Sequence, residues 1–362
     1  MEHWKIDEED AITSTTDKHT DNLRPIISIL IPARNEAENI SACLYSILPQ
    51  IDKHLPQVAE LIVIDDHSED DTARIVSDTA HPKLSLLQLR DKLKNRDNYN
   101  AYKKLALAYG LENATGEYIL QLDADIIANP DFLSTILRTI DVHNPDMIAG
   151  PVIFTSDGSK FQDFQSLDIL GMMALTATGI KTRKWFLANG ANLTYRRGLV
   201  SFSDSDTASG DDISAIQKLS QASQSKILFL TDKKGVVYTS SLETVSKFAS
   251  QRLRWGTKNK KMKGLWTWLI MGIPFANIIW LIVHPIAFIL LGEVALMIAL
   301  LHILFKLGMD YLYLTDVSEF YGERSKMRSF WYSSVAHIAY IGVIGVMSLF
   351  AKKYTWKDRH VS

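Results

Sequence analysis

The stretch YILQLDADI, residues 118–126, decides the fold class of this chain of 362 residues. Its apolar run from Tyr118 to Leu122 has strand character and ends in two aspartates one residue apart, Asp123 and Asp125. If the extended geometry persists, the period of two puts both carboxylates on the same side of the strand. They would stand at the carboxyl end of that strand, where ligands of open α/β sheets bind.

Two neighbouring carboxylates repel each other unless a hard cation lies between them. Mg²⁺ or Mn²⁺ held by one or two carboxylates normally completes its shell with substrate phosphates. Asp123 and Asp125 therefore predict a site for a metal–diphosphate complex. The alternative is that the pair only caps the helix or turn that follows, and the flanking sequence has to decide.

Strand and helix signals alternate on the amino-terminal side of this stretch. The runs IISILI, LIVID and LSLLQL predict strands, at residues 26–31, 61–65 and 84–89. Helical stretches separate them, and a further one covers Tyr99 to Ala114. This alternation predicts a parallel sheet with right-handed crossovers, so we expect the N-terminal half to be an α/β domain of nucleotide-binding type.

Composition and missing fingerprints exclude several classes of protein. The net charge of −2 gives no sign of a nucleic-acid binder. Neither G-x-G-x-x-G nor G-x-x-x-x-G-K-[ST] follows the first strand, which argues against a dinucleotide enzyme and a P-loop NTPase. The single cysteine, Cys43, excludes an intramolecular disulfide and fits a reducing compartment. No apolar segment opens the chain, so no secretory signal peptide is expected.

Polar residues after the other strands are further candidates for a site. Asp66 could accept hydrogen bonds from a base or ribose, or could cap a helix. The segment NGANLTYRR, residues 189–197, contains a glycine-alanine pair that permits close backbone approach to a ligand. Asp211 and Asp212 stand at an expected helix start, where they either favour the helix dipole or supply a general base.

A third cluster lies in QRLRWGTKNKKMK, residues 251–263. On a helix, Gln251, Arg254 and Trp255 share one face because their spacing is i, i+3 and i+4. An amide, a guanidinium and an indole together suit a site that holds phosphate and a sugar ring. The lysines that follow are interpreted as a basic stripe against an anionic membrane leaflet.

The order of these motifs resembles the family 2 glycosyltransferases, specifically the membrane-attached branch with a Q-x-x-R-W motif. The segments that carry the resemblance are PARNEAENI, VIDDHSEDDT, ATGEYILQLDADI, NGANLTYRR, SGDD and QRLRW. The resemblance implies a GT-A fold, a mixed and mainly parallel sheet flanked by helices and followed by C-terminal transmembrane helices. It also implies an inverting transfer of a sugar from a nucleotide-diphosphate sugar, with a UDP-sugar favoured, to a lipid-linked or polysaccharide acceptor.

The resemblance implies a role for each candidate residue. Asp123 and Asp125 would bind Mg²⁺ or Mn²⁺, and Asp212 would be the catalytic base, although this chain has Asp-Asp where relatives often have Glu-Asp. The donor would contact Ala33, Arg34, Glu36, Asp66, Lys104 and Asp123. The diphosphate and the acceptor would contact Asn192, Asp211, Gln251, Arg254 and Trp255.

Three apolar stretches follow Gly264, at about residues 265–283, 285–305 and 331–350. Each approaches the ~20 residues that cross a bilayer. His284-Pro285 is expected to form a tight hairpin between the first two, and Glu293 lies inside the second. We therefore expect a polar tail (1–24), a GT-A domain (25–257) and a membrane region with two to three transmembrane helices (258–362). The protein would be a multi-pass cell-membrane protein with a cytoplasmic catalytic domain.

Basic residues leave the number of crossings open. Three crossings would put the basic C-terminal residues outside, contrary to the positive-inside tendency. Either that tail is an exception, or one stretch is re-entrant or interfacial. Those basic residues are Lys352, Lys353, Lys357 and Arg359.

Two other functions compete with glycosyl transfer. A sugar nucleotidyltransferase would be expected to carry a glycine-rich loop with a lysine after the first strand, and PARNEAEN is not such a loop. A catalytically inactive membrane scaffold would be favoured by a broken D-x-D or a missing base. Both motifs are intact in this sequence.

Overall fold

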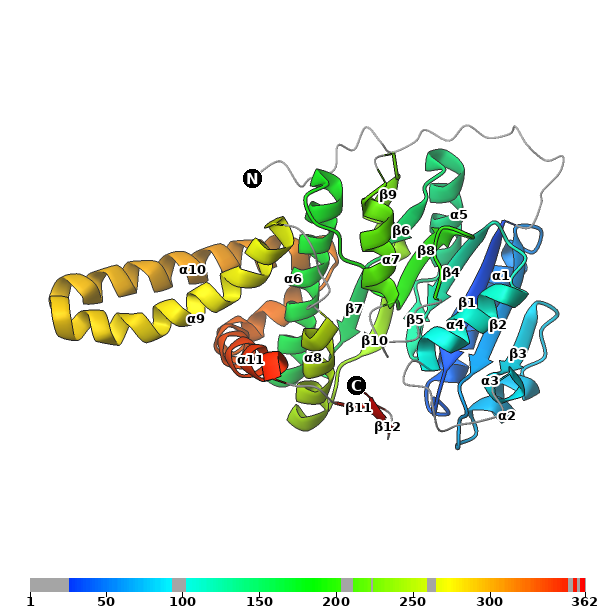
Figure 1. The fold of residues 1–362 in the computed structure, drawn as a ribbon, viewed down its shortest axis with the longest axis horizontal. Coiled ribbons are helices and arrows are strands. Elements are labelled where there is room, and N and C mark those ends of the chain that lie inside the picture. Colours follow the sequence, from blue (N-terminus) through cyan, green and yellow to red (C-terminus); the bar gives the residue numbers. More distant parts are fainter. Residues whose placement is uncertain are drawn as a thin grey trace.

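The computed structural model describes residues 26–92, 102–202, 211–222, 224–258, 265–350, 354–356 and 359–361 (Figure 1). The predicted polar tail, 1–24, lies outside this part of the chain. So do Lys260, Lys261 and Lys263 of the basic stripe, and Lys352, Lys353 and Lys357 near the C-terminus.

A sheet of seven strands forms the centre of the molecule, in the order β3-β2-β1-β4-β8-β6-β9. Only β8 runs antiparallel to its two neighbours, which confirms the mixed, mainly parallel sheet predicted from the sequence. The strands are β1 (Ile27–Ala33), β2 (Val58–Asp65), β3 (Leu84–Gln88), β4 (Tyr118–Leu122), β6 (Met147–Ala149), β8 (Asn192–Arg196) and β9 (Ile227–Phe229).

Helices cover both faces of this sheet (Figure 1). Ile29 and Ile31 of β1 belong to one hydrophobic core, with side chains of α1 and α5. Leu30, between them, belongs to a second core with Ala106 and Leu107 of α4. A strand buried on both faces needs a continuous apolar run, which explains IISILI. The helices of this region are α1 (Ile40–Lys53), α2 (Thr72–Asp78), α3 (Leu89–Lys92), α4 (Tyr102–Asn113), α5 (Phe132–His143), α6 (Lys160–Thr182), α7 (Asp211–Ser220) and α8 (Val245–Lys258).

A smaller sheet follows the aspartate stretch. It consists of β5 (Ile126–Ala128), β10 (Val237–Ser240) and β7 (Val152–Thr155), in that order. A short 3-10 helix, η3 (Lys233–Gly235), precedes β10. Since β5 begins directly after Asp125, the chain passes from one sheet to the other at the two aspartates.

The first two apolar stretches form a helical hairpin that projects from the rest of the molecule (Figure 1). The turn predicted at His284-Pro285 is wrong: α9 (Leu265–Leu291) continues through this pair, and the chain turns at Gly292. Proline is tolerated inside apolar helices, whereas the positive φ of Gly292, 60°, is a conformation that glycine adopts readily. Glu293 therefore begins α10 (Glu293–Phe320) rather than lying within it.

The chain continues from α10 through the 3-10 helix η5 (Arg324–Ser329) into α11 (Phe330–Phe350). A short hairpin of β11 (Tyr354–Trp356) and β12 (Arg359–Val361) follows. By length and composition, two segments of the described chain could cross a membrane, Glu293–Phe320 and Arg324–Met347.

A buried ion pair joins α6, α8 and α11. Arg252 Nη2 lies 2.8 Å from Asp168 Oδ2, and both side chains are 3% exposed. Tyr340 of α11 donates a hydrogen bond of 2.9 Å to the other oxygen of Asp168. The Arg252 guanidinium also stacks over the rings of Phe248, Trp255 and Tyr340. These contacts hold the third apolar stretch against the helices that cover the sheet.

We predict that Asp168→Asn strongly destabilises the protein. The substitution keeps the shape of the side chain but leaves the Arg252 guanidinium buried without its counter-charge, which typically costs about 3–5 kcal/mol. Thermal unfolding of the detergent-solubilised protein should show a large fall in Tm. The matched control is Lys247→Gln on α8, whose ammonium lies 3.8 Å from Glu243 in a mostly exposed pair and should leave Tm almost unchanged. Equal Tm values for the two variants would contradict this account.

Candidate functional site

The carboxyl ends of β1, β2 and β4 meet at one edge of the central sheet. Since β1 pairs in parallel with β2 on one side and β4 on the other, the strand order reverses at β1. Ligands of open α/β sheets bind at such a reversal. Ala33 ends β1, Asp66 follows β2 and Asp123 follows β4, and the Asp66 N–H donates to the Ala33 carbonyl at 2.8 Å. Three of the predicted donor residues therefore stand at the ends of adjacent strands.

Arg34 holds the backbone of the loop after β2. Its guanidinium is buried and donates to the carbonyls of Asp66 and His67, at 3.0 and 2.9 Å. The His67 ring lies 3.1 Å from the Asp66 carboxylate, and the φ of His67 is positive, 54°. Arg34 thus orients Asp66. The backbone of Glu36 contacts α2, because its N–H donates to Thr72 Oγ1 at 2.8 Å.

The two aspartates of the central motif do not continue the strand. β4 ends at Leu122, and a turn at residues 124–125 precedes β5, so the extended geometry on which the period-2 argument depended does not persist to Asp125. Asp123 is one-third exposed and forms an ion pair of 2.6 Å with Lys103, whereas Asp125 is exposed. The turn leaves both carboxylates accessible to a ligand.

The buried thiol of Cys43 lies close to the carboxylates at the end of β4. Burial raises the pKa of the Cys43 thiol well above its usual value, and the negative charges of Asp125, Asp123 and Glu36 raise it further. Cys43 Sγ also lies 3.8 Å from the Asp123 carbonyl. Three carboxylates therefore act on one point beside the end of β4.

This donor set fits a hard divalent cation. In the part of the chain that the structure describes, no group of three or more His, Cys, Asp or Glu side chains forms a complete metal site. Asp123 and Asp125 instead offer carboxylate oxygens alone, which suit Mg²⁺ or Mn²⁺ with the remaining ligands from water and substrate phosphates. The Lys103 ammonium on Asp123 shows that the position already attracts a cation.

Asp212 is connected to β4 through the backbone of Gly190. Its two carboxylate oxygens accept hydrogen bonds from the N–H groups of Ile213, at 2.8 Å, and Gly190, at 3.1 Å. The Gly190 carbonyl in turn accepts from Gln121 of β4, at 3.0 Å. A Cβ on Gly190 would lie 2.7 Å from Gln121 Nε2, so the glycine permits this approach. The half-buried Asp212 is thereby held in a fixed orientation near the N-terminus of α7.

Asn192 lies inside the protein rather than at the sheet edge. Its side chain is 1% exposed, and its amide donates to the carbonyls of Pro151 and Gly235, both at 3.0 Å. These bonds tie β8 to the smaller sheet, which favours a structural role over the predicted acceptor contact. The backbone of Asp211 begins α7, but its side chain lies outside the described part.

The predicted face of α8 is half-buried. Gln251, Arg254 and Trp255 are all partly exposed, and Trp255 packs against the hydrophobic core that contains β1. The Gln251 side-chain oxygen is buried and, among the described residues, has no hydrogen-bond partner.

Two residues of this region were missed by the sequence analysis. Lys104, chosen from the sequence, is buried, and the neighbouring Lys103 reaches Asp123 instead. Arg252 lies within the Q-x-x-R-W segment but binds Asp168 on α6. Neither contact leaves a local signal, because each depends on the rotation of one helix relative to distant residues.

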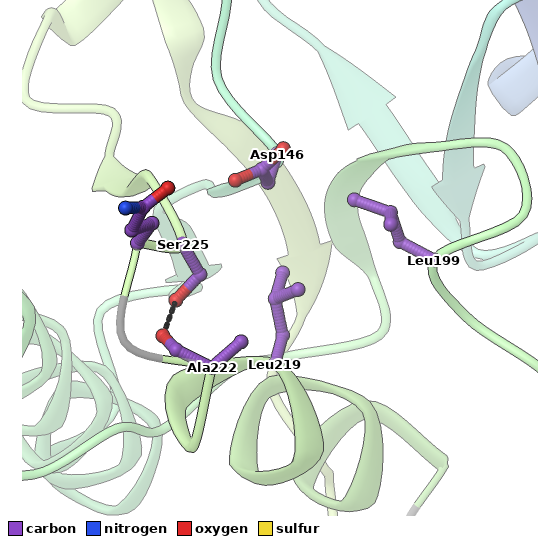
Figure 2. A pocket seen from close by; sticks show the side chains of 6 residues that line it. Asp146, Leu199, Leu219, Ala222 and Ser225 are labelled. Carbon is purple, nitrogen blue, oxygen red and sulfur yellow. Dashed lines mark hydrogen bonds between the residues drawn. The ribbon is translucent and has the colours of Figure 1, made fainter.

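A surface pocket lies at the other end of the strands, away from the candidate site. Figure 2 shows Asp146, Leu199 and Leu219 around it, with the Ser225 hydroxyl donating to the Ala222 carbonyl at 3.0 Å. Asp146 precedes β6, so this pocket is at the amino end of a strand parallel to β4. It is thus separate from the candidate site.

Comparisons with known proteins agree on one family. The model described as "Glycosyl transferase family 2" matches residues 28–202, and that described as "Glycosyl transferase family group 2" matches residues 118–349, more than half of the chain. In structure, the chain is similar to the mannosyltransferase PcManGT from Pyrobaculum calidifontis, solved with GDP-Man and Mn²⁺. The TM-score is 0.53 at 17% identity, over 91% of this chain and 88% of that one, which shows a shared fold.

Two curated relatives match a shorter part of the chain. Glycosyltransferase AglE of Haloferax volcanii is 31% identical over 133 residues, 36% of this chain and 40% of the relative. The undecaprenyl-phosphate 4-deoxy-4-formamido-L-arabinose transferase of Photorhabdus laumondii is 32% identical over 116 residues, 32% of this chain and 34% of the relative. The chain thus spans two-fifths or less of the length of these relatives.

We predict opposite effects of two substitutions on Mn²⁺ binding. Asp125→Asn should weaken the affinity about tenfold or more, a change of about 1.4 kcal/mol, because it removes a carboxylate ligand. Lys103→Met should strengthen the affinity, because its ammonium no longer competes for Asp123. Titration followed by electron paramagnetic resonance measures both. Lys92→Met, whose ammonium pairs with Glu112, is the control and should bind Mn²⁺ as the parent does. Unchanged affinity in all three variants would rule out this metal site.

Proposed function

The chain belongs to the family 2 glycosyltransferases, and we propose that it transfers a sugar from a nucleotide-diphosphate sugar to a lipid-linked or polysaccharide acceptor. The observation that carries this proposal is the chain of contacts from Asp212 through Gly190 to Gln121. It links the Asp212 carboxylate, the proposed proton acceptor, to β4, the strand directly before Asp123 and Asp125. A base and a diphosphate site at one edge are the parts that glycosyl transfer needs.

Each group would have one task in a single displacement. Asp212 removes the proton of the acceptor hydroxyl as that oxygen attacks the anomeric carbon. The bond from this carbon to the diphosphate breaks, and the configuration inverts. Because one displacement suffices, no carboxylate nucleophile of the retaining glycosidase kind is required.

Asp123 and Asp125 would hold Mg²⁺ or Mn²⁺, which neutralises negative charge on the departing diphosphate. Asp66, oriented by Arg34, would accept hydrogen bonds from the nucleotide base or ribose. Lys103, together with Arg254 and Gln251 of α8, would contact the phosphates. Trp255 would border the acceptor, and UDP is the favoured nucleotide.

The acceptor and the location follow from the C-terminal region. Two described segments could cross a membrane, and one relative is, by its name, a transferase that acts on undecaprenyl phosphate. We therefore propose a lipid-linked acceptor, or a polysaccharide grown at the membrane, and a catalytic domain (25–257) at the cytoplasmic face. The membrane region would then be 258–362.

A donor panel tests this proposal. Purified full-length protein is incubated with UDP-, GDP- and dTDP-sugars, Mn²⁺ and a lipid extract, and release of nucleoside diphosphate is measured together with transfer of label to lipid or polymer. We expect turnover with one donor class and loss of turnover with a chelator. Absence of turnover with every donor would contradict the proposal, and formation of pyrophosphate from a sugar phosphate would indicate a nucleotidyltransferase instead.

We predict that Asp212→Asn lowers the transfer rate about 10²- to 10⁴-fold, the usual contribution of a general base. Binding of the nucleotide sugar should change little, because the amide keeps the shape of the side chain and leaves the metal ligands in place. Asp211→Asn is the matched control and should be milder. Transfer rate and donor affinity are measured side by side in both variants. If Asp211→Asn is inactive and Asp212→Asn nearly normal, the base is the other aspartate.

A further inference from the structure

One face of α11 is packed against the catalytic domain along most of the helix. Phe330, Ser333 and Ser334 are buried at its start. One helical turn or more further on, Tyr340 contacts Phe164 of α6 and Phe248 of α8, with ring centroids 5.7 and 5.4 Å apart. Figure 1 shows α11 beside α6 and α8, not beside the outer part of the α9–α10 hairpin.

The opposite face of α11 is apolar and exposed. Trp331 is 68% exposed and Val335 is 70% exposed. The spacing of these residues places them on one side of the helix, away from Tyr340. An exposed stripe of this length on one helix marks a surface that contacts something apolar. Its members are Trp331, Tyr332, Val335, Val343 and Val346.

A helix packed in this way cannot cross a bilayer by itself. If α11 crossed, α6 and α8 would enter the hydrocarbon with it, because the buried Arg252–Asp168 pair and Tyr340 bind the three helices together. Tyr340, near the middle of α11, contacts Phe164 and Phe248. The exposed Lys160 and Lys247 lie within about one helical turn of those two residues. A crossing by α11 would bring both ammonium groups toward the centre of the bilayer, which is strongly unfavourable.

Both ends of α11 are attached to the catalytic side. At its start, Lys326 of η5 donates to the Phe154 carbonyl at 2.8 Å, and Ser329 donates to the Asp163 carboxylate at 2.7 Å. Burial raises the pKa of Asp163, but hydrogen bonds from Arg328, Ser329 and Ser156 outweigh it and hold the pKa below its usual value. Past its end, β11 contacts α8 (Figure 1). A crossing helix would have its ends on opposite sides.

We infer that α11 lies in the plane of the membrane surface, with its exposed face in the boundary between lipid headgroups and acyl chains. Among the described elements, the α9–α10 hairpin then enters the bilayer, and the C-terminal end lies on the side of the catalytic domain. The occupant of the apolar face is lipid because α10 leads directly into η5 and α11, so the stripe is continuous with the membrane hairpin. Aromatic residues such as Trp331 and Tyr332 are typical of this boundary.

This arrangement removes the conflict in charge that three crossings would create. With α11 on the surface, the basic residues of η5 and Arg359 of β12 lie on the same side. That side is the cytoplasmic one under the positive-inside tendency. The inference rests on the proposed membrane attachment, and its test separates the two.

Depth measurement with nitroxide labels tests the orientation of α11. Full-length protein in lipid vesicles is labelled in turn at Trp331→Cys, Val335→Cys and Val343→Cys, and the accessibility of each label to oxygen and to a water-soluble nickel chelate is compared. The natural Cys43 is fully buried and should not react. Asp71→Cys, at an exposed position directly before α2, is the control for a label fully accessible to water.

A surface helix gives the three labels the same shallow depth. A crossing helix would give depths that differ by about 18 Å between residues 331 and 343, at 1.5 Å per residue, and would overturn the inference while leaving membrane attachment intact. Three labels as accessible to water as the Asp71→Cys control would overturn the inference, and failure of the protein to stay with the vesicles would overturn membrane attachment itself. In sealed vesicles, a membrane-impermeant maleimide should label Ser362→Cys and Asp71→Cys from the same side. Labelling from opposite sides would also refute the arrangement.

Discussion

The parallel pairing of β1 with β2 on one side and β4 on the other is the constraint on which the rest depends. Helices α1 and α4 pack in the cores on opposite faces of the sheet, and polar residues from three distant parts of the chain meet between them. Burial is the largest cause of the raised pKa of the Cys43 thiol, and the carboxylates gathered there raise this pKa further. Such a concentration of negative charge attracts cations, and Lys103 of α4 pairs with Asp123.

Helix α8 connects the candidate site to α11, the helix proposed to lie on the membrane surface. Gln251 and Trp255 belong to its predicted ligand face, while Arg252 binds Asp168 and stacks on Tyr340 of α11. The same helix turn thus touches both the proposed phosphate site and the helix proposed to rest on lipid. An acceptor that approaches along the membrane surface would meet α8 without leaving the lipid boundary.

Much of the sheet was predictable because strands buried on both faces need continuous apolar runs, as in IISILI. Lys104 was chosen from the family resemblance, and Lys103 was not considered. Adjacent residues of a helix differ by about 100° in direction, so local sequence does not fix which one faces a distant aspartate. The turn between Asp123 and Asp125 was not predicted. It arises because β5 pairs with β10, a strand more than 100 residues away, in a second sheet. The error at His284-Pro285 has a different origin, since proline ends helices in water more strictly than in apolar surroundings.

During synthesis, α9 and α10 emerge as two apolar helices joined by a single residue, Gly292. Their backbone groups are satisfied across the join, because the Gly292 N–H donates to Phe288 and its carbonyl accepts from Ala295. The tip carries one ionisable residue, Glu293, at the first position of α10. If the hairpin is the membrane anchor proposed above, it enters the bilayer as one unit with no hydrophilic loop to translocate. The domain that ends with α8 then stays on the side on which it is made.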